Sequence, residues 1–148
     1  MTVKLTPLTI MLLTMLAQPL RAETLTDTIQ ISSVPEIYVG GTGLLCTSQQ
    51  NETEYLLVTR NLRHLGIAEF DADDIKYDKL EIDEKTPDLL VFDSFFSTAK
   101  VYRKSLKVEI RKFNQSSIEY LTCKDSSVSD VHNAAEQKLR DLLNGNKI

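Results

Sequence analysis

Two cysteines are the residues of this chain with the clearest chemistry. Cys46 and Cys123 are its only cysteines, and they lie far apart in the sequence. They therefore form neither the Cys-x-x-Cys motif of a redox site nor the close ligand spacing of a zinc site. In an oxidising compartment, an even pair of this kind is typical of a disulfide bond. We predict a Cys46–Cys123 bridge, with no metal site and no cofactor.

His64 is the one histidine in the part of the chain that is rich in strand-forming residues. It follows Arg60 and Arg63, so this segment could bind an anion or supply a general acid or base. No nucleophile motif such as Gly-x-Ser-x-Gly accompanies it in the sequence. We therefore assign no catalytic residue and keep an enzyme using His64 as an alternative. The second histidine, His132, is expected on the polar side of a helix, at the surface.

Two further segments resemble ligand-binding motifs only in part. The glycine-rich run 40–43 lacks the spacing of a phosphate loop, so we expect a tight bend or a bulge there. The acidic segment 69–84 does not fit the calcium-binding loop of an EF-hand. An irregular calcium site around Asp71, Asp73 and Asp74 stays open, beside the simpler interpretation of a solvated turn.

Basic side chains gather in one stretch of the second half of the chain. Lys107 and Arg111 fall on the same face of a predicted strand, and Arg103 and Lys104 precede them. We call these four residues the basic strip. The strip could bind an acidic protein or an anionic glycan, or it could serve only to keep that face of the sheet soluble.

Four aromatic residues lie close together in sequence: Phe92, Phe95, Phe96 and Tyr102. In a closed barrel these side chains could line a cavity for a small ligand. The alternative is that they simply fill the hydrophobic core.

The first 22 residues predict that the chain is exported. Lys4 gives a basic start, residues 8–16 form an almost unbroken apolar run, and Ala22 is a small residue suited to cleavage. The run is shorter than the roughly 20 apolar residues of a transmembrane helix. We therefore predict a signal peptide over residues 1–22, a periplasmic or secreted protein, and no stable membrane insertion after cleavage. An uncleaved anchor is the alternative.

Cleavage would leave one domain over residues 23–148, long enough to bury a hydrophobic core. The signal segment carries Lys4 and Arg21 and no acidic residue, so its removal takes the net charge from −4 to −6. An acidic chain binds nucleic acid poorly, because phosphate contacts dominate that affinity. We expect no nucleic-acid partner, and the sequence leaves the oligomeric state open.

Most of the remaining chain shows the apolar patterns of short strands. Residues 106–111 alternate strictly between apolar and charged side chains, as a strand with one dry face does. Residues 75–82 alternate with a one-residue slip that a bulge would produce, and residues 61–70 fit either a helical turn or a strand. Further strand signals lie at 37–46, interrupted by the glycines, and at 55–59, 89–92 and 118–124.

The last two strands predict a hairpin with a defined register. If the turn is the polar segment 114–117, Phe113 lies opposite Ile118, and Val108 lies opposite Cys123. Cys123 then shares the dry face with Val108, which suits a buried bridge.

The chain ends in a predicted amphipathic helix over about 128–144. Ser127 and Asp130 resemble a capping box, and Glu136 and Arg140 are spaced as an exposed ion pair. The narrow apolar stripe of this helix indicates that it lies on a sheet or a barrel. We therefore predict a mainly β fold, a single antiparallel sheet or small barrel-like domain with a C-terminal amphipathic helix. An α+β fold with a second helix at 61–70 is the alternative.

Sheet signals without a catalytic constellation favour a binding domain over an enzyme. Its size, acidity and predicted disulfide suit a non-enzymatic, inhibitor or immunity-type domain whose partner is another extracytoplasmic protein. A lipocalin-like carrier that uses the aromatic group is the first alternative, and the enzyme using His64 is the second.

Overall fold

A computed structural model describes residues 33–145 of the chain, so the predicted signal peptide, residues 1–22, lies outside the described residues. The described residues form eight strands, preceded by a short 3₁₀ turn and followed by one helix. Their bounds are η1 Glu36–Tyr38, β1 Thr42–Ser48, β2 Thr53–Val58, β3 His64–Asp71, β4 Asp74–Lys85, β5 Leu89–Asp93, β6 Ser97–Tyr102, β7 Lys107–Lys112, β8 Ile118–Ser126 and α1 Val128–Gly145.

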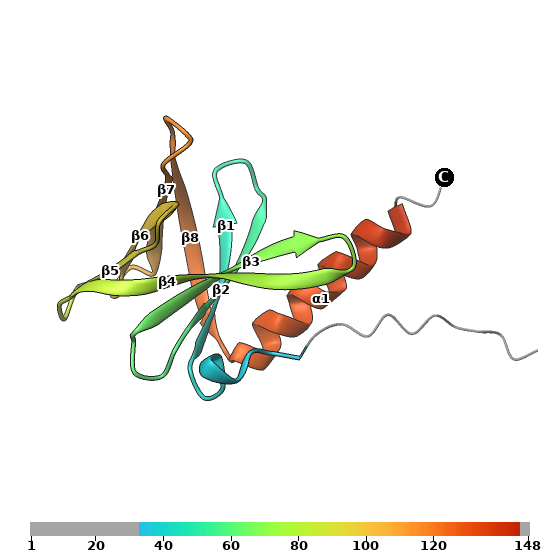
Figure 1. Ribbon diagram of the computed structural model, residues 1–148, viewed down its shortest axis with the longest axis horizontal. Helices are drawn as coiled ribbons and strands as arrows, with labels where there is room; N and C mark the ends of the chain where they lie inside the picture. The colour runs from blue at the N-terminus through green and yellow to red at the C-terminus, as the bar shows by residue number, and fades with distance from the viewer. Residues whose placement is uncertain (1–32, 146–148) are drawn as a thin grey trace, which may run out of the picture.

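The strands form a closed antiparallel barrel (Figure 1). Each strand pairs with the next one along the chain, and β8 pairs with β1 to complete the circle. The predicted mainly β fold with a C-terminal helix is confirmed, and the barrel-like form of that prediction is the observed one. The α+β alternative is wrong, because residues 64–71 pair with β4 along their whole length.

Two hydrophobic cores lie on the two sides of the barrel wall. The first fills the interior, because alternate side chains of every strand point inward. The second lies outside the barrel, where α1 and the 3₁₀ turn cover the outer faces of β2, β3 and β4. The most deeply buried members of the outer core are Tyr38, Leu57, Val131, Ala135 and Leu139.

These two cores explain the one-residue slip in the apolar pattern of residues 75–82. The slip does not come from a bulge at that position. Ile75 and Tyr77 point outward and pack under α1, whereas Leu80 and Ile82 point into the barrel. The pairing of β4 with β3 is continuous through this stretch. The strand therefore keeps a regular period of two while the buried face changes. A register shift does occur further along, between Ile82 and Glu84 against β5.

Helix α1 matches its predicted start, end and position. The Ser127 hydroxyl accepts a hydrogen bond from the backbone N–H of Asp130 at 3.0 Å, which caps the first turn. Glu136 and Arg140 form the expected i,i+4 ion pair at 3.8 Å. The helix lies across the outside of the barrel, against β1, β2 and β4 (Figure 1).

The glycine-rich run brings α1 close to the barrel, in agreement with the predicted bend. Gly40 has a positive φ of 74°, a conformation that glycine adopts without strain. A Cβ on Gly43 would stand 2.6 Å from the Ser127 carbonyl oxygen and 2.6 Å from Val131 Cγ2. The missing side chain therefore allows the start of the helix to lie directly on β1.

The predicted register of the β7–β8 hairpin is wrong by two residues. Val108 lies opposite Leu121, not opposite Cys123. The turn is two residues longer than predicted, because the ladder with β8 ends at Arg111 and Ile118 and the Lys112 carbonyl accepts the backbone N–H of Gln115 at 3.0 Å. Phe113 lies in this turn and donates its backbone N–H to the Phe96 carbonyl in the neighbouring turn, at 2.9 Å. A shift of two residues preserves the face of every side chain. Cys123 accordingly still lies in the interior core with Val108, as predicted.

Candidate functional site

Four turns lie toward the same end of the barrel, which we call the barrel mouth. They are the turns that join β1 to β2, β3 to β4, β5 to β6 and β7 to β8, because successive hairpins of an up-and-down barrel alternate between its ends. A surface cleft of about 680 Å³ opens there between Glu69, Asp78, Lys112 and the β5–β6 and β7–β8 turns.

Three exposed phenylalanines stand at this mouth, and we call them the aromatic tip. Phe95 and Phe96 form most of the β5–β6 turn, with exposed fractions of 87% and 71%, and Phe113 in the β7–β8 turn is 60% exposed. The rings of Phe95 and Phe96 meet edge to face, with centroids 5.1 Å apart. The hydrogen bond between Phe113 and Phe96 holds the two turns together. All three residues line the mouth cleft.

The β5–β6 turn is held rigidly by its own polar side chains. The Ser94 hydroxyl accepts backbone N–H bonds from Phe96 at 3.2 Å and from Ser97 at 3.1 Å. The Ser94 backbone N–H donates in turn to the Ser97 carbonyl at 2.8 Å. The two phenylalanines are therefore presented on an ordered turn, which lowers the entropy that a partner must remove on binding.

Charged side chains surround the interior of the mouth. By strand register, Glu54, Asp78, Lys112 and Glu119 point inward from β2, β4, β7 and β8. Burial raises the pKa of the Glu54 carboxyl above its ordinary value, and repulsion from Glu119 and Glu52 adds to the rise while Lys112 opposes it. The mouth is therefore a polar end to an otherwise apolar interior.

The basic strip divides into two pairs with different surroundings. Lys107 and Arg111 are exposed on the outer face of β7, the single face that the sequence predicted. Arg103 and Lys104 lie in the β6–β7 turn at the opposite end from the mouth. There, Lys104 forms an ion pair with Asp88 at 2.7 Å, and Arg103 donates to the Thr86 carbonyl at 3.2 Å.

Arg103 and Lys104 are thus tied to the neighbouring β4–β5 turn. Arg111 by contrast lines a small cleft together with Phe113, so the outer end of the strip is continuous with the aromatic tip.

The four aromatic residues of the predicted ligand cavity do not come together. Phe92 is fully buried in the interior core, whereas Phe95 and Phe96 are exposed at the tip. Tyr102 lies on the outer face of β6, where its hydroxyl donates to Glu109 Oε1 at 3.0 Å. Side chains of the described strands pack the barrel interior, so these residues form no common internal cavity.

His64 lies at the start of β3 with partial exposure, and it shares a shallow surface hollow with Thr59, Arg60 and Asn61. Its Nε2 atom is 3.9 Å from Glu81 Oε1, on an exposed glutamate. Its backbone N–H donates to the Thr59 hydroxyl at 3.0 Å, which fixes the β2–β3 turn. This geometry gives the residue a structural role in the turn.

The acidic segment 69–84 does not bring its carboxylate oxygens together as a calcium site would require. Asp71 forms an ion pair with Lys76, and Asp74 Oδ1 accepts the backbone N–H of Ile75 at 2.8 Å. Among residues 33–145, no cluster of three or more histidine, cysteine, aspartate or glutamate side chains is placed to hold a metal ion.

His132 is buried, which corrects the expectation that it lies at the surface. Its side chain sits between the barrel and α1 with 4% of the residue exposed. Nδ1 lies 2.8 Å from the Tyr77 hydroxyl, and Nε2 lies 3.5 Å from Glu136 Oε1. The helical wheel places His132 beside Val128 and Val131 on the edge of the apolar stripe. That position was the available signal that the residue is covered.

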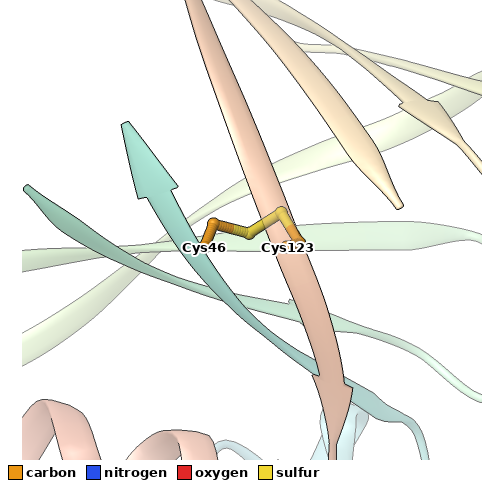
Figure 2. The surroundings of a disulfide bond; sticks show 2 residues. All are labelled: Cys46 and Cys123. Atoms are coloured by element: carbon orange, nitrogen blue, oxygen red, sulfur yellow. A yellow bond between two sulfur atoms is a disulfide. The ribbon is translucent and has the colours of Figure 1, made fainter. Parts of the chain in front are cut away.

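The disulfide predicted from the cysteine count is present. Cys46 and Cys123 are directly paired residues of β1 and β8, with Cα atoms 3.9 Å apart (Figure 2). Both side chains belong to the interior core. The bridge therefore joins the first and last strands at the seam where the barrel closes.

Comparison with known protein families, with curated proteins and with solved structures finds no match for this chain. Within the described part of the chain, no helix is long and apolar enough to span a membrane. The assignment of function consequently rests on the site itself.

Proposed function

We propose that this chain is a non-enzymatic binding domain that engages another protein outside the cytoplasm, in an inhibitor or immunity-type role. The observation that carries the proposal is the aromatic tip. Three exposed phenylalanines on two ordered, linked turns form a concentrated apolar surface. Aromatic residues are enriched in the cores of protein interfaces, where a few anchor residues carry most of the binding energy.

The surroundings of the tip support a protein partner over a purely apolar ligand. A polar rim encloses the aromatic centre of most protein interfaces. Here Glu69, Asp78 and Lys112 share the mouth cleft with the phenylalanines, and Arg111 adjoins Phe113. The partner is expected to offer an apolar pocket with an acidic side chain on the side of Arg111.

The disulfide supports a periplasmic or secreted location for this interaction. Structural bridges persist in oxidising compartments and are rare in the cytosol. Cys46 and Cys123 are both buried, so the bridge serves the scaffold and leaves the surface of the mouth free for binding.

The proposal is tested by capture and then by measured affinity. The oxidised domain is immobilised in a periplasmic or culture extract, the captured protein is identified and purified, and its affinity is measured by calorimetry. Replacing Phe95 and Phe96 together by serine should weaken binding at least about thirtyfold, because the loss of even one anchor residue costs about 2 kcal/mol or more.

Charge reversal provides the matched control. Arg111→Glu should weaken the complex, and Lys138→Glu, on the exposed side of α1, should leave the affinity unchanged. A partner whose affinity is the same for the wild type and for the double serine variant would refute the role of the aromatic tip.

A further inference from the structure

A second surface of the barrel has the composition of a sugar-binding site. It is a groove of about 460 Å³ on the outer faces of β6, β7, β8 and β1, which we call the outer groove. Helix α1 packs mainly against β1, β2 and β4, and β6 and β7 lie on the other side of the barrel (Figure 1). The side chains that define it are Thr47, Tyr102, Lys107, Glu109, Tyr120 and Thr122.

Strand register sets these side chains in two adjacent rows. Thr47, Thr122, Lys107 and Tyr102 follow one another across the four strands in one row. The next row places Tyr120 beside Glu109. The two tyrosines therefore stand at diagonally opposite corners, with Lys107 and Glu109 between them.

The polar groups in this groove have unused hydrogen-bonding capacity. Tyr102 donates to Oε1 of Glu109 at 3.0 Å, which orients the carboxylate and leaves Oε2 as an acceptor. Lys107 forms no ion pair within residues 33–145, so its ammonium remains a donor. The hydroxyls of Thr47 and Thr122 can both donate and accept.

We propose that the outer groove binds a short neutral saccharide. A sugar ring carries hydroxyls that donate and accept around its edge, and its C–H groups pack against aromatic rings. The groove offers an acceptor, a donor and hydroxyls between two tyrosines, of which Tyr120 is 46% exposed.

Other ligand classes fit this groove less well. A phosphate group would meet the Glu109 carboxylate beside a single lysine. A lipid chain would leave the polar groups of the groove without partners. An extended peptide binds sheets by pairing with an open strand edge, and the described strands close into a barrel without one.

The test uses the oxidised domain with N,N′-diacetylchitobiose and with maltose as probes. Two-dimensional NMR should show shifts centred on the backbone amides of Lys107, Glu109, Tyr120 and Thr122 in the presence of at least one probe. The chain contains no tryptophan, so tyrosine fluorescence should change in the same titration.

Variants separate the groove from the aromatic tip. Tyr120→Ala and Glu109→Gln should each weaken sugar binding at least tenfold, and Tyr120→Phe should retain it because the ring is kept. Phe95→Ala serves as the matched control and should bind the sugar normally. Failure of the sugar test would leave the proposed protein partner unaffected, because that complex depends on Phe95 and Phe96.

Two outcomes would overturn the proposal. One is the absence of groove shifts with both sugars while each variant shows the wild-type melting temperature. The other is a response of Lys107 to a tetra-aspartate peptide but to neither sugar, which would assign the groove to an acidic protein segment.

Discussion

At the scale of single residues, three polar side chains under α1 show how the helix is positioned on the barrel. The Tyr77 hydroxyl and Nδ1 of His132 form a hydrogen bond of 2.8 Å, and Glu136 lies on the other side of the imidazole ring. Burial raises the pKa of the Tyr77 hydroxyl far above its ordinary value, and Glu136 adds to the rise. The phenol therefore keeps its proton, and one defined contact fixes the rotation of the helix against β4.

Glu54 is the residue through which the barrel mouth should respond to pH. Because its pKa is raised in the folded state, ionisation of Glu54 destabilises the fold as the pH rises above the ordinary value of 4.5. Below that pH the carboxyl is protonated in both the folded and the unfolded states, and the penalty disappears.

We therefore expect Glu54→Gln to be more stable than the wild type at pH 7 and equally stable at pH 4. Urea unfolding at the two pH values measures the difference. Glu36→Gln, which removes an exposed carboxylate from the 3₁₀ turn, is the control and should show no such difference. Equal stability of Glu54→Gln and the wild type at both pH values would show that the mouth carries no such penalty.

At the scale of elements, the contact between α1 and β1 depends on one missing side chain. Gly43→Ala would place a methyl group 2.6 Å from the Ser127 carbonyl and from Val131 Cγ2. The expected loss is about 1–3 kcal/mol, as for other insertions into packed interiors. Thermal unfolding measures it, and Gly145→Ala is the control because nothing lies within 4 Å of its Cβ position. Wild-type stability of Gly43→Ala would mean that the helix shifts without cost.

The sequence predicts elements well where a single core determines the pattern. β7 buries only one face, so its strict alternation identified the strand, and the capping serine located the start of α1. The sequence predicts a strand less well where both faces of that strand are buried. Tyr55, Leu56, Leu57 and Val58 are buried in succession because the barrel interior and the helix cover opposite faces of β2.

The candidate site was harder to predict than the fold, because it depends on turns that are distant in sequence. Phe95 and Phe96 could be singled out as aromatic residues of one segment. Phe113 comes to lie beside them only because its backbone N–H donates a hydrogen bond to the Phe96 carbonyl of another hairpin. The outer groove likewise combines β1 with β6, β7 and β8, which are neighbours only after the barrel closes.

At the scale of the whole molecule, the disulfide should account for a large part of the stability. It joins residues 77 positions apart, and in the chain-entropy model closure of a loop of that length destabilises the unfolded chain by roughly 4–5 kcal/mol. Replacing both cysteines by alanine should lower the free energy of unfolding by that order. Urea unfolding of the wild type with dithiothreitol should show a similar loss, and the reductant should not affect the double variant.

The position of the bridge also makes the barrel a covalent ring. All seven turns that connect the described strands lie between Cys46 and Cys123. A protease that cuts any one of these turns therefore separates no fragment, because the two pieces stay linked through sulfur and through the paired strands. The chain can present exposed loops in a compartment rich in proteases and survive a single nick as one molecule.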